Sequence, residues 1–214
     1  MAAPWDGPVA DEVADRRVRS SEVVFHGKVW DVRRDEVDLG DGQTVVRDVL
    51  QHPGAVGVLA LDDDERVLLV RQYRHPTGRM LWEAPAGLLD VEGERPLAAA
   101  QRELVEEAGY RAQRWHVLVD YYNSPGGTTE AFRCYLARGL EAVAEDERHE
   151  GEGEERDMPA AWVPLDEAVD LVLAGALHNP TTVSGVLAAA AARSRGWSGL
   201  RPADAPWPER FPEG

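Results

Sequence analysis

The feature that most constrains the fold is a pair of apolar segments on either side of a short acidic turn. The segments AVGVLAL (55–61) and RVLLVRQYRH (66–75) flank DDDE (62–65). Their lengths and β-branched residues are typical of strands, and the short connection predicts a β-hairpin. Because both strands are so apolar, we expect the hairpin to lie in a hydrophobic core. The acidic turn lacks the ligand spacing of a calcium loop, so we interpret it as a plain turn.

The remaining strands are also predicted in pairs, and the helices are few. Residues 29–52 form a hairpin around GDGQ, and residues 115–123 and 129–140 form another around SPGGT. Cap, Pro and Gly signals predict three helices, at residues 96–108, 166–174 and 180–194. Asp166 is the predicted cap of the second helix, and Asn179 is the predicted cap of the third. Strands in hairpins with few helices predict the α/β class: an α/β/α sandwich with a mixed β-sheet, plus a small N-terminal antiparallel β-sheet.

Composition divides the chain into four parts. Residues 1–17 are rich in Pro, Ala and charge, and we expect them to be a mobile arm. The N-terminal β-sheet domain takes residues 18–52, and the main domain takes residues 53–198. Residues 199–214 are a Pro-rich tail that we expect to lack regular structure.

The charge balance excludes one class of partner. The chain has 214 residues and a net charge of −16, from 39 Asp and Glu against 23 Lys and Arg. Such a surface repels phosphate backbones, so we expect no binding to nucleic acids. A small anionic substrate is compatible with this charge if bound cations reverse the local field.

The chain carries no predicted signal for export or for a membrane span. The one cysteine, Cys134, cannot form an intramolecular disulfide, and its strand-like context indicates a small buried hydrophobic residue. The N-terminus lacks the apolar segment of a signal peptide, and no apolar run approaches the ~20 residues of a membrane span. We therefore expect a cytoplasmic protein with no membrane partner.

One predicted helix concentrates negative charge. The segment RELVEEAGY (102–110) places Glu103, Glu106 and Glu107 within two turns, beside Arg102. At ~100° per residue the carboxylates fall in an arc of roughly 100°, where like charges repel. A divalent cation would offset this repulsion, and carboxylate oxygens suit Mg²⁺ or Mn²⁺ rather than zinc. Arg102 can pair with Glu106, four residues on. Taken alone, the segment is also compatible with a solvated helix face.

The segment from Gly87 to Tyr110 closely resembles the Nudix box, G-x5-E-x7-R-E-U-x-E-E-x-G-U, where U is a bulky aliphatic residue. From Glu94 onward the spacing matches throughout, with Tyr110 in the last U position. Six residues instead of five separate Gly87 from Glu94, so the loop is one residue longer than in the motif. The resemblance implies a Nudix hydrolase, which cleaves a nucleoside diphosphate linked to another group, built on a Nudix-type sandwich.

The resemblance also implies roles for individual residues. Glu103, Glu106 and Glu107 would be metal ligands, and the Ala86 carbonyl would complete one coordination shell. Two or more Mg²⁺ or Mn²⁺ ions would clamp the diphosphate and lower the pKa of a bridging water. Glu106 and its orienting partner Arg102 would thus belong to the catalytic group.

The wider chain, roughly Val29 to Ala190, looks like bacterial ADP-ribose pyrophosphatases. Those enzymes carry a Pro about fifteen residues beyond the box, and Pro125 occupies that position here. Their catalytic base is a Glu on the loop before the last strand. Glu155 in EGEERDM is the best match, with Glu152 and Glu154 as alternatives and an acidic loop without a catalytic role as the other interpretation.

Substrate contacts follow from the same resemblance. Arg47 and Arg74 match positions that hold adenine or phosphates in relatives, and surface arginines on strands are the alternative. Trp30 is a candidate for stacking on adenine, although we favour a packed core position for it. Glu83 is a candidate contact for the terminal ribose or a metal. Relatives exchange their N-terminal sheets across a two-fold axis, so we expect a homodimer.

Three functions are compatible with these residues. The first is Mg²⁺-dependent hydrolysis of ADP-ribose to AMP and ribose 5-phosphate. The second keeps this chemistry and changes the substrate to another nucleotide sugar, such as GDP-mannose. The third is a non-catalytic Nudix-like module that binds a nucleotide sugar and regulates a partner. We favour the first, because every box carboxylate is present and because Pro125 and the EERDM segment resemble the ADP-ribose enzymes.

Overall fold

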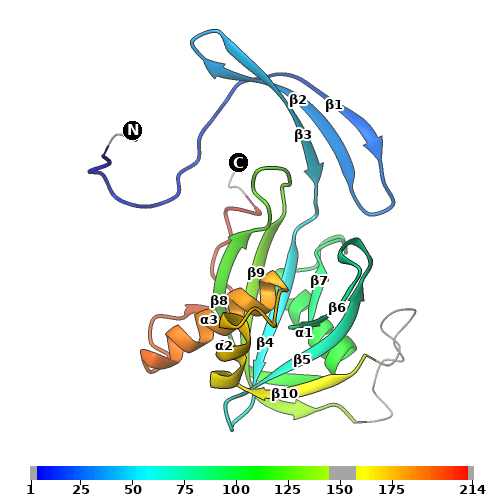
Figure 1. Cartoon of the computed structure of the whole chain (residues 1–214), viewed down its shortest axis with the longest axis vertical. Helices are drawn as coiled ribbons and strands as arrows, with labels where there is room; N and C mark the ends of the chain where they lie inside the picture. The colour runs from blue at the N-terminus through cyan, green and yellow to red at the C-terminus, as the bar shows by residue number, and fades with distance from the viewer. Residues whose placement is uncertain (1–3, 145–157, 212–214) are drawn as a thin grey trace. The chain divides into compact units, whose positions relative to one another are not determined.

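The structure is a computed structural model that describes residues 4–144 and 158–211. The chain forms two compact units, Met1–Gln51 and His52–Gly214 (Figure 1). Residues 4–17 are exposed and contain no helix or strand, and the mobility of this arm stays a prediction. No helix within the described ranges is long and apolar enough to cross a membrane.

A three-stranded antiparallel sheet makes up the folded part of the first unit. Its strands are β1 (Val18–His26), β2 (Asp31–Gly40) and β3 (Gln43–Gln51), in the order β1-β2-β3. Asp41 and Gly42 connect β2 to β3 with φ angles of 52° and 78°, and left-handed angles at both positions are typical of tight hairpin turns. The hairpin predicted from GDGQ is confirmed, and β1 extends it into the small antiparallel sheet.

Much of the apolar surface of this small sheet is exposed within its own unit. A three-stranded sheet has no helix of its own to cover either face, so large hydrophobic side chains stay accessible. Those at least 42% exposed are Val18, Val23, Val24, Phe25, Val29, Trp30, Leu39 and Val46. The packed core position that we favoured for Trp30 is therefore wrong within this unit, because its residue surface is 42% exposed.

An eight-stranded mixed sheet forms the centre of the second unit. The strand order is β10-β5-β4-β9-β8-β11, with β6 paired to β5 and β7 paired to β4. The pairing of β4 with β9 is parallel and the other pairings are antiparallel. The bounds are β4 (Ala55–Leu61), β5 (Arg66–Arg74), β6 (Arg79–Glu83), β7 (Ala86–Leu88), β8 (Tyr110–Tyr122), β9 (Ala131–Ala142), β10 (Ala160–Pro164) and β11 (Arg201–Pro202), and a short 3₁₀ helix, η1 (His75–Thr77), joins β5 to β6.

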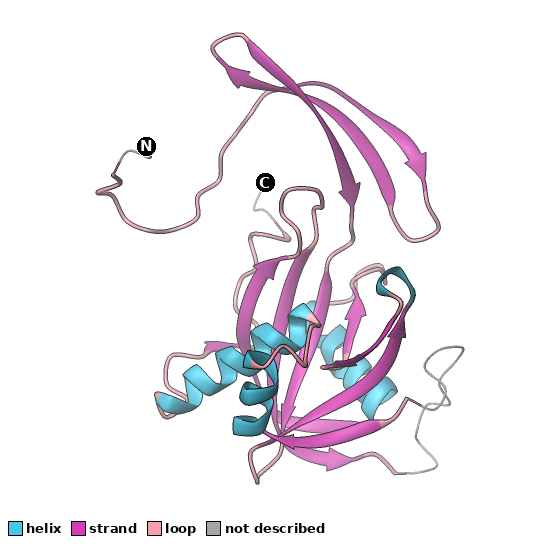
Figure 2. Ribbon diagram, in the orientation of Figure 1, coloured by secondary structure: helices cyan, strands magenta, loops and turns pink. Residues whose placement is uncertain are grey.

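Helices cover both faces of this sheet, as Figure 2 shows. Side chains of β4 alternate between two hydrophobic clusters, because successive residues of a strand point to opposite faces. Val56 and Val58 pack with Leu104 of α1 (Pro96–Ala108). On the other face, Leu59 and Leu61 pack with residues of α2 (Leu165–Leu173) and α3 (Pro180–Ser194). Every residue of β4 is buried, so both the core hairpin and the α/β/α sandwich are confirmed.

The ends of two helices follow their sequence signals, and the start of one does not. Gly109 ends α1 with a left-handed φ of 68°, and the Asn179 side chain caps α3 by accepting from the Thr182 amide at 3.0 Å. Asp166 was predicted to cap α2, and this is wrong. The helix begins one residue earlier, at Leu165, because that side chain is 1% exposed and belongs to the core.

The expectation that the C-terminal tail lacks regular structure is wrong at β11, which pairs with β8. Beyond β11, Trp207 is 5% exposed and joins the core cluster on the α1 side of the sheet. Arg133 lies over the Trp207 ring at 4.7 Å and donates to the carbonyl oxygens of Ala205 at 2.7 Å and Pro206 at 3.0 Å. A buried arginine thus fixes a Pro-rich segment by binding its backbone carbonyls.

Candidate active site

The residues of the predicted metal site line one pocket of about 350 Å³ in the second unit. The pocket lies where α1 faces β7 and the end of β5. Its lining includes polar side chains from β5, the β7 region and α1, which are Gln72, Arg74, Asp90, Arg102, Glu103, Glu106 and Glu107, together with Ala86, Gly87, Leu88 and Val91. Segments about thirty residues apart in the sequence therefore meet at a single concave surface.

Arg102 is the hub of the charged side chains on α1. Its guanidinium binds Glu94 with two parallel hydrogen bonds, from Nε and Nη2, both 3.0 Å long. Nη1 donates to Glu103 at 2.6 Å and to Glu106 at 2.9 Å, so the predicted pairing with Glu106 is present. The hydrogen bonds from Arg102 lower the pKa of the Glu94 carboxyl below its ordinary value of 4.5. The bonds with Glu94 are also the main cause of a raised pKa for Arg102.

Glu107 and Glu103 contact the backbone of β7 directly. The Ala86 amide donates to Glu107 at 2.9 Å, and this bond ties the strand to the helix. Gly87 lies against the Glu103 side chain so closely that an added Cβ would come within 2.7 Å of its Cγ, and closer still to its carboxylate. The φ angle of Gly87 is not left-handed, so backbone conformation does not explain a glycine here. The reason is the close approach of the backbone to Glu103, because a larger residue would displace that side chain from its present position.

The additional residue in the loop does not displace Glu94. After β7, the Glu94 amide donates to the Val91 carbonyl at 3.2 Å, and Gly93 adopts a left-handed φ of 77°. The extra residue is accommodated in this turn, and the Glu94 side chain still reaches Arg102. The longer loop is therefore compatible with the spacing of the helix residues.

A family profile described as NUDIX domain matches residues 51–182. The chain belongs to the Nudix family. It is 46% identical over 191 residues to the ADP-ribose pyrophosphatase of Mycobacterium tuberculosis, covering 89% of this chain and 90% of that protein. It is 30% identical over 182 residues to the GDP-mannose pyrophosphatase of Cronobacter sakazakii, covering 80% and 90%.

A solved crystal structure of an ADP compounds hydrolase has the same fold as this Nudix protein. The TM-score is 0.73 at 22% sequence identity, and the alignment covers 87% of this chain and 99% of the other. The predicted Nudix-type sandwich is thus confirmed.

The donor set of the Nudix pocket fits a hard divalent cation. Carboxylates and a backbone carbonyl are the ligands that Mg²⁺ and Mn²⁺ prefer. Within the described part of the chain, however, no three His, Cys, Asp or Glu side chains converge closely enough to hold a metal. The reason is that Arg102 draws Glu103 and Glu106 towards itself, while Glu107 binds the Ala86 amide. The carboxylates would have to leave these partners to converge on an ion.

Arg74 and Glu83 were predicted as separate contacts of the substrate, and the structure pairs them. Arg74 Nη2 donates to Glu83 at 2.7 Å and Nε donates at 3.0 Å. Glu83 is 2% exposed and does not line the pocket, whereas Arg74 does. Glu83 therefore orients an arginine at the pocket wall. A direct contact of Glu83 with substrate or metal stays a prediction.

Among the described residues, Arg47, Trp30 and Pro125 are absent from the lining of this pocket. Arg47 is exposed on β3 and Trp30 precedes β2, so both belong to the first unit. Pro125 is exposed in the turn between β8 and β9. The candidate bases, Glu155 with its alternatives Glu152 and Glu154, lie outside the described residues. Their roles all stay predictions.

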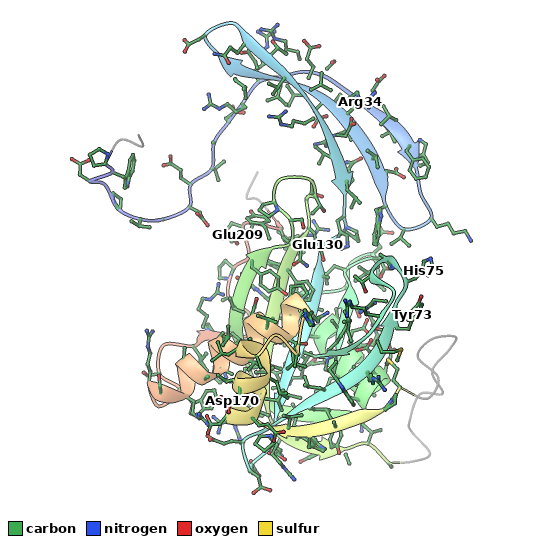
Figure 3. All side chains as sticks on the ribbon, in the orientation of Figure 1. Arg34, Tyr73, His75, Glu130, Asp170 and Glu209 are labelled. Carbon is green, nitrogen blue, oxygen red and sulfur yellow. The ribbon has the colours of Figure 1, made fainter. Side chains whose placement is uncertain are left out.

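Two polar residues of the Nudix pocket, Gln72 and Asp90, were missed in the sequence. Gln72 is two residues before Arg74 on β5, and strand periodicity places both side chains on the same face. Tyr73, between them, lies with His75 on the outer side of the β5–β6 hairpin, where the Tyr73 hydroxyl is 3.3 Å from His75 Nδ1 (Figure 3). The same alternation could have identified Gln72 from the sequence.

The contact between Gly87 and Glu103 can be tested by adding one methyl group. We predict that Gly87→Ala lowers the free energy of unfolding by about 1–3 kcal/mol, the usual cost of overpacking. A Glu103→Ala background removes the three atoms nearest to the added Cβ, so the loss should largely disappear. Urea unfolding of the four proteins measures this coupling. Gly126→Ala is the matched control, because a Cβ at Gly126 meets no atom within 4 Å. Equal losses in both backgrounds would contradict the proposed clash.

The ion pair between Glu94 and Arg102 predicts a pH dependence of stability. Because the folded pKa of Glu94 lies below its ordinary value of 4.5, the pair stabilises the fold fully above that pH. The contribution is lost as the pH falls through the lower, folded pKa. We expect wild type to exceed Glu94→Gln in unfolding free energy near neutral pH, and the gap to narrow below pH 4.5. Urea unfolding over that range checks this, and a gap independent of pH would exclude the charge as its source.

Proposed function

We propose that this protein is a Mg²⁺-dependent hydrolase that converts ADP-ribose and water to AMP and ribose 5-phosphate. The observation that carries the proposal is the pocket that combines four box residues of α1 with Arg74. The 46% identity to an ADP-ribose pyrophosphatase over most of both chains supports the choice of substrate.

The metal ligands are proposed from the same pocket. Glu103, Glu106, Glu107 and the Ala86 carbonyl would hold two or more Mg²⁺ or Mn²⁺ ions. When bound, the ions would neutralise the diphosphate and lower the pKa of a coordinated water, so that the resulting hydroxide could attack the diphosphate. Arg102, whose opposite edge is bound by Glu94, would hold Glu103 and Glu106 at the pocket wall before ions bind, and the two carboxylates would turn from it to reach a metal.

Two further steps need groups of the chain itself. Arg74 would bind a phosphate of the substrate, since its planar fork matches phosphate oxygens and Glu83 fixes its orientation. Glu155 is the proposed general base that takes the proton of the attacking water. Arg47 and Trp30 are proposed to bind the adenine, and Pro125 is proposed to shape the substrate site.

The alternative functions have less support. Identity to a GDP-mannose pyrophosphatase is 30%, against 46% to an ADP-ribose pyrophosphatase. A regulatory module without catalysis would not need the box carboxylates, yet all of them are present and one guanidinium organises three of them.

A homodimer with exchanged N-terminal sheets, located in the cytoplasm, completes the proposal. The exposed apolar side chains of β1 and β2, such as Phe25 at 61%, would be covered by a second copy. A sedimentation measurement on the full chain should give the mass of a dimer, and a monomer would contradict this arrangement. The single buried Cys134 is compatible with a reducing compartment, and fractionation of cells can test that location.

The substrate and the metal site can be tested together. We expect the purified protein with Mg²⁺ to release AMP from ADP-ribose faster than it cleaves GDP-mannose in a panel of nucleotide sugars. Glu107→Gln removes one charged ligand, so the rate with ADP-ribose should fall roughly 100-fold or more. Glu167→Gln, an exposed position on α2, is the matched control and should retain the rate. Preference for GDP-mannose would favour the second function, and binding without turnover would favour the third.

The proposal that Glu155 is the general base can be tested separately from the metal site, by comparing kcat with the affinity for Mn²⁺. Glu155→Gln should lower kcat roughly 100-fold while the affinity for Mn²⁺ changes little, because a general base contributes to proton transfer only. Glu152→Gln and Glu154→Gln are the neighbouring controls. An unchanged rate in Glu155→Gln, with a loss in one of these two variants, would move the role to that residue.

A further inference from the structure

A buried amide lies two residues before the proposed ligand carbonyl of Ala86. Ala84 and Pro85 connect β6 to β7, and Ala84 is 1% exposed, so its N–H cannot reach water. A buried backbone amide requires a hydrogen-bond partner. Ala84 finds it in a side chain of another layer, since its N–H donates to Thr182 Oγ1 at 2.9 Å.

Thr182 is itself held in place by the start of α3. Its residue surface is 0% exposed, and its amide donates to the cap residue Asn179 at 3.0 Å. Its hydroxyl lies 3.4 Å from both the Asn179 side-chain oxygen and the Trp82 carbonyl, so it can donate to either while it accepts from Ala84. The Thr182 hydroxyl therefore has a partner both as a donor and as an acceptor, and it holds the Ala84 amide in place.

The anchored segment leads directly to the pocket. The Pro85 carbonyl accepts from the Val58 amide at 2.8 Å, and the Ala86 amide donates to Glu107 at 2.9 Å. Ala86 is thus fixed by β4 on one side, by α1 on another, and by α3 through Ala84. The contact with β4 is made by backbone atoms, and the contact with α1 is made by Glu107, a proposed ligand. Only the contact with Thr182 can therefore be removed by a substitution that leaves the proposed ligands unchanged.

We propose that Thr182 is a positioning residue that sets the Ala86 carbonyl for metal binding. The inference rests on the proposed function, because it assumes that Ala86 is a ligand. Thr182 touches neither metal nor substrate and acts through the backbone of residues 84–86. Loss of its hydroxyl leaves the Ala84 amide without a partner, and the segment shifts to recover one.

The neighbouring Thr181 provides a matched control. It is 3% exposed, lies on the same turn of α3, and its hydroxyl is 2.9 Å from the Tyr121 hydroxyl. Thr181→Val therefore removes a buried hydrogen bond of the same kind that leads to β8 instead of the pocket. Thr182→Ser keeps the hydroxyl that accepts from Ala84.

The experiment measures Mn²⁺ binding to the full-length protein without substrate, together with the Mg²⁺ concentration that gives half the maximal rate. We expect Thr182→Val to weaken Mn²⁺ binding roughly three- to tenfold, at the lower end for residues that orient metal ligands. The half-maximal Mg²⁺ concentration should rise by a similar factor, with kcat at saturating Mg²⁺ close to wild type. Thr182→Ser and Thr181→Val should bind Mn²⁺ within about twofold of wild type.

Thermal unfolding of each variant separates positioning from stability. Equal Mn²⁺ affinity in wild type and Thr182→Val, with only a lower Tm, would overturn the proposal and leave the proposed function intact. If Thr182→Val does not fold, Thr182→Ala decides, because it also removes the hydroxyl that accepts from Ala84 but places no methyl group against that amide. It should weaken Mn²⁺ binding in the same direction, and unchanged binding would overturn the proposal. Wild-type protein that binds no Mn²⁺ would overturn the metal site and this inference together.

Discussion

A single guanidinium holds the charged face of α1 together. Arg102 contacts Glu94, Glu103 and Glu106, so one positive charge faces three carboxylates. The two bonds with Glu94 use one edge of the guanidinium, and the remaining donors reach the two helix carboxylates. Because the negative charge exceeds the positive charge, the pocket keeps a field that attracts divalent cations. The same field would repel a diphosphate until cations are bound, which makes metal and substrate binding interdependent.

The position of this helix follows from the burial of β4. With hydrophobic clusters on both faces, β4 receives α1 on one side and α2 and α3 on the other. It also pairs with β7, so the backbone of Ala86 and Gly87 is held against the carboxylates of α1. The site is therefore assembled from the sheet centre outwards. Contacts from α3 reach it through Thr182 and Ala84, although these residues are far apart in the sequence.

Some features escaped prediction for identifiable physical reasons. Asp166 has the chemistry of a helix cap, but burial of Leu165 starts α2 earlier. The tail is rich in proline, yet its carbonyls meet a buried Arg133 and its Trp207 fills a place in the core. Glu83 and Arg74 were expected to act separately, but Glu83 pairs with Val70 across β5 and β6, and the long Arg74 side chain reaches it there. In each case a partner distant in the sequence outweighs the local pattern.

The sequence by itself determined the class of fold, the ends of α1, the identity of the acidic helix face and the family to which it belongs. These features depend on spacing within a few turns or one hairpin, which local geometry controls. Only the tertiary structure decided that Arg102 also binds Glu94, that Gly87 leaves room for Glu103, and that Asp90 and Arg74 line the same pocket. Those contacts join separate elements of the sheet and helix, and their distances depend on how the layers pack.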